Sequence, residues 1–443
     1  MLKFTRRQGF GLGAGAMLGT SMLGRGSQAA LAVKDVAPPK WEIEKGASLR
    51  VLRPAKFVQG DETLFLENTK KFTAKTGIEV RVDSEGWEDM RPKTVVAANV
   101  GSGPDVILAW QDDPHLFETK LLKLDDLNEY LGEKYGGWFK VAEFYGKNKA
   151  GNWISMPVGG SGGTMVYRIS WLKEAGFSDV PGDFPGFLAC CKALQKIGHP
   201  AGLALGNAVG DGGWTDWVLW GYGSSLVDEN NKVVINNPKT LEALNYAFEL
   251  YKTFIPGTLA WLDPSNNKAF LAGEVGLTSN GISIYYAAKT SPDPAMKALA
   301  EDIGHGDYPV GPAGIPSQGA TVINAMIMGY TKFPNAAKEY LRFMMEEEQY
   351  VEWQKASIGY WGHPLMAYDK NPLWDTDPKV TPYKNVMRKA LPQSYKGDPT
   401  EAAAAAKADF VTLNMFQQVC AGNMTPQAAM EDAERRGKRY FKA

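Results

Sequence analysis

Acidic, amide and tryptophan side chains gather at three points in the first third of the chain, each directly after a run of residues that favours a β-strand. Carboxylates and amides form hydrogen bonds with hydroxyl groups, and indole rings cover apolar C–H surfaces. Such a set could hold a polyhydroxylated molecule in a pocket that is mostly apolar, with a few well-placed polar groups. The candidate ligand contacts are Gln59, Asp61, Glu62, Trp87, Trp110, Asp112 and Asp113.

A second set of candidates lies further along the chain and adds glycines to the same residue types. Glycine lets a backbone approach a ligand closely. The stretch GGWTDWVLWGYG, residues 212–223, spaces three tryptophans three residues apart, which suits one side of a helix. The predicted contacts in this set are Ser161, Asp211, Trp214, Asn280, Gly281, Tyr285, Gln318 and Trp361.

Structural roles compete with ligand binding at several of these positions. Asp61 and Asp113 could each cap a helix, because carboxylates accept hydrogen bonds from free N–H groups in the first turn. Trp214 begins the expected helix and is predicted to touch the ligand. Trp220 points about 120° away from Trp214 and is predicted to pack in the core. The sequence does not decide between a core position and a ligand contact for Trp217.

Patterns for catalysis and for metal binding are missing from the sequence. Cys190, Cys191 and Cys420 show neither CxxC nor Cys/His ligand spacing, so we expect them to be buried as small apolar side chains. The four histidines are scattered, and His363 is predicted to be structural. We expect no catalytic residue, no metal and no cofactor. Since 48 basic residues balance 49 acidic ones without a basic run, we expect no nucleic-acid partner.

The N-terminus has the three parts of an export signal. Arg6 and Arg7 precede a Gly-rich, weakly apolar run, which is typical of a twin-arginine signal, and a general secretory signal is the alternative. Small residues around Ala32 predict cleavage there, so residues 1–32 would be removed. The sequence therefore predicts a soluble protein in the periplasm, with residues 33–46 as a short leader segment before the fold.

The elements that must position these residues alternate along the chain. Residues 48–55, 78–85 and 104–110 read as strands, and residues 62–77 and 90–103 between them read as helices, with Gly77 as a stop. This order favours a parallel sheet covered by helices. A second such series follows, and the last quarter is mainly helical. Two α/β units predict two lobes with a ligand cleft beyond the strand ends.

Five motifs along the chain together resemble those of a known family. The motifs are GSGPDVILAWQDD, GNWISMPVGGSGGTMVYR, GEVGLTSNG, PNAAKEYLRFMMEEE and TPQAAMEDAERRGKRYF, in this order. They resemble the extracellular solute-binding proteins of bacterial ABC importers, specifically the sugar-binding, maltose-binding-protein-like branch. The resemblance covers nearly all of residues 47–443.

The resemblance implies a two-lobed α/β periplasmic binding protein fold of type II, in which parallel-sheet lobes are joined by crossover strands. The crossovers would fall near residues 156–158, 318–322 and 361–365. The first lobe would hold residues 47–157 plus 318–362, and the second would hold residues 158–317 plus 363–443. The implied partners are a small carbohydrate or polyol and an inner-membrane ABC permease with its ATPase. The protein would act as a monomer that closes on its ligand.

The ligand class has alternatives. Arginine is sparse among the candidate contacts, which favours a neutral sugar, oligosaccharide or polyol over an anion. Asp61, Asp112 and Asp113 beside aromatic rings would also suit a cationic amine such as a polyamine. The family's basic residue is replaced by Asp113, and its tryptophan after Gly281 is replaced by Ser283. An exported carbohydrate-active enzyme, or a sensor that uses the same fold, are the rival functions.

Overall fold

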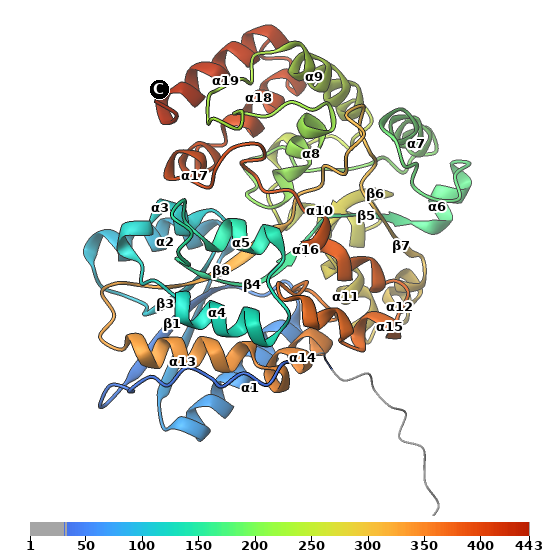
Figure 1. Ribbon diagram of the computed structural model, residues 1–443. Helices are drawn as coiled ribbons and strands as arrows, with labels where there is room; N and C mark the ends of the chain where they lie inside the picture. Colours follow the sequence, from blue (N-terminus) through green and yellow to red (C-terminus); the bar gives the residue numbers. More distant parts are fainter. Residues whose placement is uncertain (1–30, 32, 443) are drawn as a thin grey trace, which may run out of the picture.

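The structure is a computed structural model that describes residue 31 and residues 33–442 (Figure 1). The larger of its two sheets has five strands. The strand order is β2-β1-β3-β8-β4. The first three strands are parallel, as predicted, whereas β8 runs antiparallel to both of its neighbours. The strands are β1 (Ser48–Pro54), β2 (Glu79–Glu85), β3 (Val106–Ala109), β4 (Met156–Ser161) and β8 (Thr321–Ile327).

Helices cover this sheet on both faces (Figure 1). Gly77 ends the first helix in the left-handed region, at φ 75°, as the sequence predicts. The N-cap of the same helix is Val58, so the prediction of a cap at Asp61 is wrong. The helices are α1 (Gln59–Thr76), α2 (Trp87–Val100), α3 (Asp113–Leu116), α4 (Asp125–Lys134), α5 (Lys140–Gly146), α13 (Pro334–Met345) and α14 (Glu347–Ala356).

The second sheet has three strands in the order β6-β5-β7. These are β5 (Thr164–Arg168), β6 (Leu277–Asn280) and β7 (Ile303–Gly306). Both neighbours run antiparallel to β5, so the prediction of a parallel sheet in both lobes is wrong for this one. The reason is the direction of entry: β5 begins at the connection from β4, whereas β6 ends beside that point, at Asn280.

Helices surround this smaller sheet and continue to the C-terminus (Figure 1). They are α6 (Ile169–Glu174), α7 (Phe184–Lys196), α8 (Trp214–Gly221), α9 (Pro238–Tyr251), α10 (Ser265–Leu271), α11 (Ser283–Thr290), α12 (Pro294–Glu301), α15 (Leu373–Thr376), α16 (Val386–Lys389), α17 (Glu401–Ala408), α18 (Val411–Cys420) and α19 (Pro426–Tyr440). Short 3-10 turns occur at Glu118–Lys120, Asp211–Gly213, Thr258–Ala260, Met366–Lys370 and Thr381–Asn385.

The connections between the two sheets run side by side. Gly160 and Gly362 exchange two backbone hydrogen bonds, of 2.8 and 2.6 Å. Ser161, at the end of β4, pairs with Thr321, at the start of β8. Three segments that are distant in sequence therefore meet in one narrow strip, which can act as a hinge because few residues cross it. The lobe boundaries predicted from the sequence stay a prediction.

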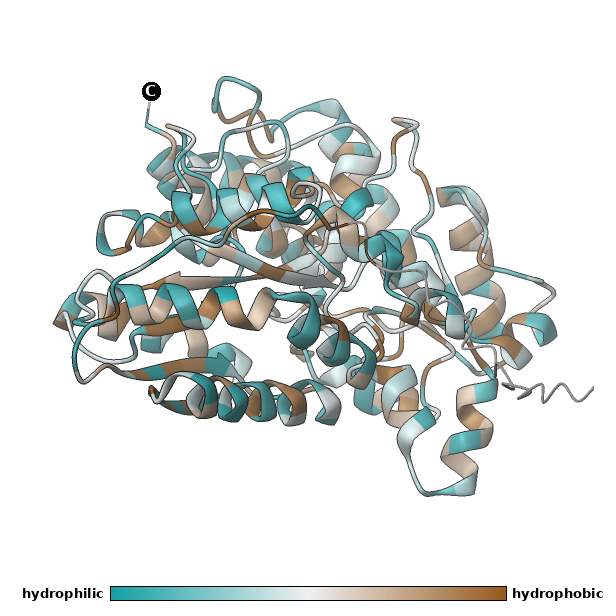
Figure 2. Ribbon diagram, turned by 60° about the horizontal axis from the view of Figure 1, so that its bottom comes forward, coloured by the Kyte–Doolittle hydropathy of each residue, from teal (hydrophilic) through white to brown (hydrophobic). Residues whose placement is uncertain are grey.

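Two clusters of buried hydrophobic side chains form the interior. One surrounds the larger sheet and continues to one face of the smaller sheet, where it includes Val166 and Ile303, and the other packs on the opposite face of the smaller sheet, where it includes Met165 and Tyr167. Figure 2 shows hydrophobic strands enclosed by helices that carry both hydrophobic and hydrophilic residues. The segment 33–46 lies against the first lobe: Lys34 N–H donates to the Lys134 carbonyl at 2.9 Å, and Trp41 donates to Asp126 at 2.8 Å. The predicted export signal lies outside the described residues, apart from Leu31. Among those residues, none of the helices has the length and apolar content needed to span a bilayer.

Candidate functional site

A cavity of about 450 Å³ lies between the two sheets, and its two sides differ in chemistry. Aromatic rings from the first lobe and its returning segment form one side, which we call the aromatic wall: Phe57, Trp87, Trp110, Tyr360 and Trp361. Polar side chains from the second lobe form the other side, which we call the polar wall: Asp211, Asp263, Asn267, Asn280 and Ser283. We call this space the cleft cavity. Ser161, Gly162, Gly210, Gly281 and Thr321 complete its lining.

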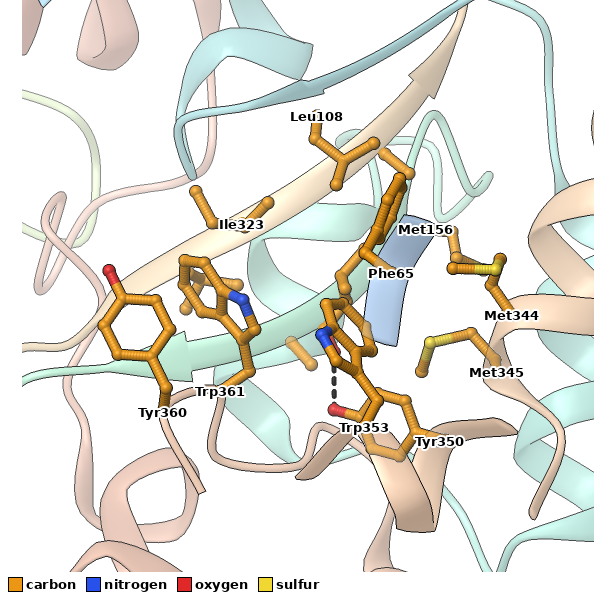
Figure 3. Close-up of a cluster of buried hydrophobic side chains, with 14 of the residues drawn as sticks. Phe65, Leu108, Met156, Ile323, Met344, Met345, Tyr350, Trp353, Tyr360 and Trp361 are labelled. Carbon is orange, nitrogen blue, oxygen red and sulfur yellow. Dashed lines mark hydrogen bonds between the residues drawn. The ribbon is translucent and has the colours of Figure 1, made fainter. Parts of the chain in front are cut away.

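The aromatic wall is a continuous set of ring contacts. The Trp87 ring centroid lies 5.5 Å from that of Phe57, 4.9 Å from that of Trp110 and 6.1 Å from that of Trp361. Tyr360 extends the row at 4.6 Å from Trp361, and Figure 3 shows these two rings side by side over β8. The rings come from the loop after β1, the start of α2, the end of β3 and the loop after α14. Predicted contacts Trp87, Trp110 and Trp361 are thus brought together.

Asp61 lies beneath this wall rather than in the cavity. Its Oδ1 accepts hydrogen bonds from the indole N–H of Trp353, at 2.9 Å, and of Trp361, at 3.1 Å. Its other oxygen pairs with the buried guanidinium of Arg53, which also lies 4.5 Å from the Phe65 ring. Asp61 therefore orients two indoles, which lie next to each other in Figure 3, and its predicted contact with a ligand stays a prediction.

Asp112 and Asp113 are held by one arginine. Arg91 on α2 donates from Nη2 to Asp112 at 2.9 Å and from Nε to Asp113 at 2.5 Å. Burial lowers the pKa of Arg91, but the two carboxylates outweigh this and raise it above the ordinary value. Asp113 is fully buried and also accepts from the Trp110 N–H at 3.3 Å, so it supports the aromatic wall in this structure, and its predicted contact with a ligand stays a prediction. Asp112 is absent from the lining of the cleft cavity and borders a different one.

Gln59 and Glu62 point away from the cavity. Gln59 donates to the Thr63 hydroxyl at 3.1 Å, within α1, and Glu62 pairs with Lys56 at the surface. Neither Gln59 nor Glu62 lines the cleft cavity, so the structure does not bring these two predicted contacts together with the others. The physical reason is the helix start: it begins at Gln59, which turns these side chains to the outside of the first turn.

Two carboxyl groups dominate the polar wall. Asp263 Oδ1 accepts from the backbone N–H groups of Gly210, at 3.1 Å, and Asp211, at 2.8 Å. Burial raises the pKa of Asp263 to about 6, and burial together with the neighbouring Asp263 raises the pKa of Asp211 well above its usual range. Asp211 Oδ2 is a buried acceptor without a partner among the described residues. The predicted contact Asp211 therefore does face the cavity.

An amide network completes the polar wall. Asn280, at the end of β6, donates to Asn267 Oδ1 at 2.5 Å and accepts from the Gly281 N–H at 2.6 Å. Asn267 in turn donates to the Ser283 hydroxyl at 2.8 Å. A Cβ on Gly281 would come within 2.5 Å of Ser161 Oγ, so this position needs glycine. Predicted contacts Ser161, Asn280 and Gly281 meet here, and the network fixes the polar groups before a ligand arrives.

The tryptophans of α8 depart from the prediction. Trp214 is 1% exposed, its indole N–H donates to the Ala204 carbonyl at 2.7 Å, and its ring contacts Phe254. It lines the neighbouring cavity and not the cleft cavity, and its predicted contact with a ligand stays a prediction. Trp217 is fully buried and donates to the Pro309 carbonyl. Trp220 is buried as predicted, yet it lines two cavities beside the cleft.

Two further predicted contacts lie elsewhere. The Tyr285 hydroxyl donates to Asp377 at 2.6 Å, and Tyr285 does not line the cleft cavity because it lies on the side of α11 that faces segment 377–380. Gln318 is buried at the second connection, where its carbonyl accepts from the Leu391 N–H. It does not line the cavity either. His363 is fully buried and bonded to Asp369 at 2.9 Å, and burial lowers its pKa, in agreement with a structural role.

Sequence reasoning missed eight lining residues: Phe57, Gly162, Gly210, Asp263, Asn267, Ser283, Thr321 and Tyr360. Phe57 and Tyr360 directly adjoin predicted segments, so widening those segments by one or two residues would have included them. Asp263 and Asn267 belong to LDPSNN, where an acid and a proline precede α10. That segment follows no strand, so a search restricted to loops after strands passed over it. An acid before proline at a helix start was the available signal.

Cys190, Cys191 and Cys420 are buried free thiols, and burial raises the pKa of each. Among the described residues, no three His, Cys, Asp or Glu side chains lie where they could share a metal ion.

Two α/β lobes joined by a narrow strip of strands, with a lined cavity between them, define the class of two-lobed binding proteins. The chain belongs to the bacterial extracellular solute-binding protein family, whose pattern matches residues 67–382.

Individual relatives are distant. A probable ABC transporter-binding protein of Deinococcus radiodurans is 25% identical over 203 residues, which are 44% of this chain and 47% of that protein. The diacetylchitobiose binding protein DasA of Streptomyces coelicolor is 24% identical over 295 residues, 63% of this chain and 65% of that protein. The chain thus spans about half to two thirds of the length of these relatives.

Solved structures with the same fold cover nearly the whole chain. Maltose-bound MalE3 of T. maritima superposes with a TM-score of 0.76 at 18% identity, over 89% of this chain and 100% of its own. A solute-binding protein of Agrobacterium vitis with bound D-mannitol gives 0.72 at 16% identity, over 90% and 99%. At such identities the likeness shows the two-lobed fold alone.

Proposed function

We propose that this protein captures a neutral sugar, oligosaccharide or polyol outside the inner membrane and delivers it to an ABC permease, without catalysis. The observation that carries the proposal is the pairing of the two walls across one cavity. Aromatic rings suit the C–H faces of a sugar, and the polar wall suits its hydroxyl groups. The relatives named above, which bind diacetylchitobiose, maltose and mannitol, support the same ligand class.

The charges around the cleft cavity favour a neutral ligand over a cationic amine. The acids of the first lobe are neutralised by Arg53 and Arg91. Burial and the neighbouring Asp263 raise the pKa of Asp211, which favours its neutral form, and a neutral carboxyl can both donate to and accept from a hydroxyl. The remaining acid, Asp263, already accepts two backbone N–H groups. A cationic amine stays the second candidate, because neither Asp211 nor Asp263 has a basic partner among the described residues.

Closure would couple binding to delivery. A ligand between the walls contacts residues of both lobes only when they are closed, so it favours that form. The hinge strip at Gly160, Ser161 and Gly362 would absorb the movement. The permease would then recognise the closed surface, as the export signal and the fold together suggest.

Calorimetry with glucose, maltose, laminaribiose and mannitol, beside spermidine as the cationic probe, tests the proposal. We expect heat of binding with a neutral ligand, none with spermidine, and compaction in X-ray scattering. Trp110→Ala should weaken binding about thirtyfold, because it removes one ring of the wall. Trp41→Ala is the matched control, since Trp41 lies on the far segment 33–46. If the protein bound spermidine and none of the sugars or mannitol, its ligand would be a cationic amine and not a neutral carbohydrate.

A further inference from the structure

Residues 390–400 run between the two lobes and contain no helix or strand among the described elements. We call this segment the latch. It leaves α16, which packs on α5 and β4 of the first lobe, and it enters α17, which packs on α18 and α19 of the second lobe. Helix α17 also contacts α3 of the first lobe, and Figure 1 shows these two helices next to each other at the boundary. The latch therefore lies where the lobes would separate.

Two contacts join the latch to the first lobe. The Tyr145 hydroxyl on α5 accepts a hydrogen bond from the Gln393 N–H at 2.6 Å. Tyr145 is 2% exposed, so this bond is shielded from water. Lys149 Nζ, in the turn after α5, lies 3.1 Å from the Asp398 carboxylate at the surface. None of these four residues lines the cleft cavity, so both contacts can form without a ligand.

The latch is also fastened to the second lobe. The Asp398 N–H donates to Asn231 Oδ1 at 2.8 Å, and Asn231 Nδ2 donates to Asp398 Oδ2 at 2.9 Å. The Tyr395 ring lies 5.7 Å from that of Trp220. When the lobes separate, the contacts on one side of the latch must break. The side of the first lobe is the weaker one, because one of its two contacts is the exposed ion pair with Lys149.

The region beneath the latch favours separation of the lobes. A cavity of about 720 Å³ lies there, lined by the latch and by both lobes. His115 is 3% exposed, and neither of its ring nitrogens has a hydrogen-bond partner among the described residues. The same holds for Asp112 Oδ1, Gln393 Oε1 and Ser394 Oγ. Buried polar atoms without partners cost free energy, which contact with water recovers on opening. The contacts of the latch oppose this tendency.

We propose that the latch stabilises the closed form of the ligand-free protein through the contacts Tyr145–Gln393 and Lys149–Asp398. The ligand-free protein then has a closed population, and a ligand in the cleft cavity increases it, because the contacts of the ligand add to those of the latch. This inference goes beyond the proposed function, since it concerns the protein without ligand and holds for any molecule that the cleft cavity accepts.

X-ray scattering of the ligand-free protein tests the proposal, with each profile fitted as a sum of closed and open forms. The variant Tyr145→Phe/Lys149→Ala removes both contacts to the first lobe. We expect the ratio of closed to open protein to fall about tenfold, since one neutral hydrogen bond and one exposed ion pair together have this effect. The radius of gyration should rise accordingly.

The matched control removes the same two kinds of contact within single lobes. Tyr330→Phe deletes a hydroxyl that donates to the Pro104 carbonyl at 2.6 Å in the first lobe. Lys252→Ala deletes an exposed pair with Glu249 in the second lobe. The variant Tyr330→Phe/Lys252→Ala should therefore scatter like the wild type. A control that opens as far as Tyr145→Phe/Lys149→Ala would overturn the proposal.

Asp398→Asn tests the latch without disturbing its fold. Asparagine keeps the backbone donor and a side-chain acceptor for Asn231, and it removes only the charge that attracts Lys149. We expect the ratio of closed to open protein to fall about twofold, and high salt should bring the wild type to the same value. This variant decides the question if the unfolding midpoint of Tyr145→Phe/Lys149→Ala is lowered.

Two further results would overturn the latch and leave the proposed function untouched. One is a ligand-free wild type without a closed population. The other is an equal ratio of closed to open protein in the wild type and in Tyr145→Phe/Lys149→Ala, at equal unfolding midpoints. Failure to bind any saccharide, polyol or amine would instead overturn the proposed function, and the scattering of the ligand-free protein would still decide on the latch.

Discussion

The two walls of the cleft cavity are built by opposite strategies. In the aromatic wall, the ligand-facing groups are rings, and the charged groups lie behind them as buried ion pairs: Asp61 with Arg53, and Asp113 with Arg91. In the polar wall the carboxyl groups face the cavity themselves, and the backbone N–H groups of Gly210 and Asp211 hold Asp263. An acid near a cleft supports the fold when it is paired with arginine, and it is available to a ligand when it has no basic partner.

This difference also determines how the replacement of each acid changes the stability of the fold. A buried acid that is paired with arginine supports the fold, because its loss leaves an unpaired charge in the interior. An acid without a basic partner costs stability in exchange for a group available to a ligand. The substitutions that follow separate these two cases, from the largest expected effect to the smallest.

Asp61→Ala removes the support of the aromatic wall. It leaves Arg53 buried without its partner and frees the indole N–H groups of Trp353 and Trp361. We expect the free energy of unfolding to fall by about 3–5 kcal/mol, measured by urea titration. Glu62→Ala is the matched control, since its pair with Lys56 lies at the surface and should be worth less than about 1 kcal/mol. Equal losses in the two variants would remove the distinction between supporting and exposed acids.

Trp214→Ala tests the helix behind the polar wall. The ring is buried and its N–H is bonded to Ala204, so we expect a loss of about 3–4 kcal/mol in stability. Ligand affinity, measured on the folded fraction at low temperature, should change little. A large loss of affinity with an unchanged unfolding midpoint would restore Trp214 to the ligand contacts that the sequence predicts.

The sequence predicted local elements and exposed rings better than the partners of buried acids. Strand and helix patterns predicted the β1–β3 unit with α1 and α2, because hydrophobic periodicity is local. The rings Trp87, Trp110 and Trp361 were found because tryptophans in loops are rare and conspicuous. The roles of Asp61 and Asp113 were not predictable, since Arg53 and Arg91 meet them only through the tertiary fold.

The polar wall was harder to predict for a physical reason. Asp263 and Asn267 reach the cavity from the start of α10, and Asn280 from the end of β6, so nothing local marks them as a group. The antiparallel order of β6, β5 and β7 brings them together, and the sequence pattern predicted a parallel sheet instead. Whether an acid finds a basic partner depends on the assembled fold and not on the neighbouring sequence.

Asp263→Asn tests the cost of the unpaired acids. The folded state raises the pKa of Asp263 from 3.8 to about 6, so the folded protein holds its proton where the unfolded chain has lost it. Stability should therefore fall as the pH rises from about 4 to about 6 and stay lower above that, and the variant should lack this fall. Asparagine keeps an acceptor for Gly210 and Asp211. We expect a gain of about 1–3 kcal/mol at pH 7.

Denaturant titrations at pH 4, 5, 6 and 7 provide the measurement. Asp307→Asn is the control, because Asp307 is an exposed acid paired with Lys389 and should show a nearly parallel pH profile to the wild type. A gain for Asp263→Asn that is as large at pH 4 as at pH 7 would mean that its charge is not the cause.

Tyr285→Phe marks the edge of the polar wall and should have the smallest effect. The hydroxyl donates to Asp377 outside the cleft cavity, and Lys289 still pairs with that carboxylate in the variant. We expect a loss of about 0.5–1.5 kcal/mol in stability and no change in ligand affinity by calorimetry. Ser283→Ala, on the same helix but within the polar wall, is the matched contrast and should weaken binding with little loss of stability. If Tyr285→Phe weakened binding more than Ser283→Ala, the polar wall would have to extend along α11, beyond the residues that line the cavity.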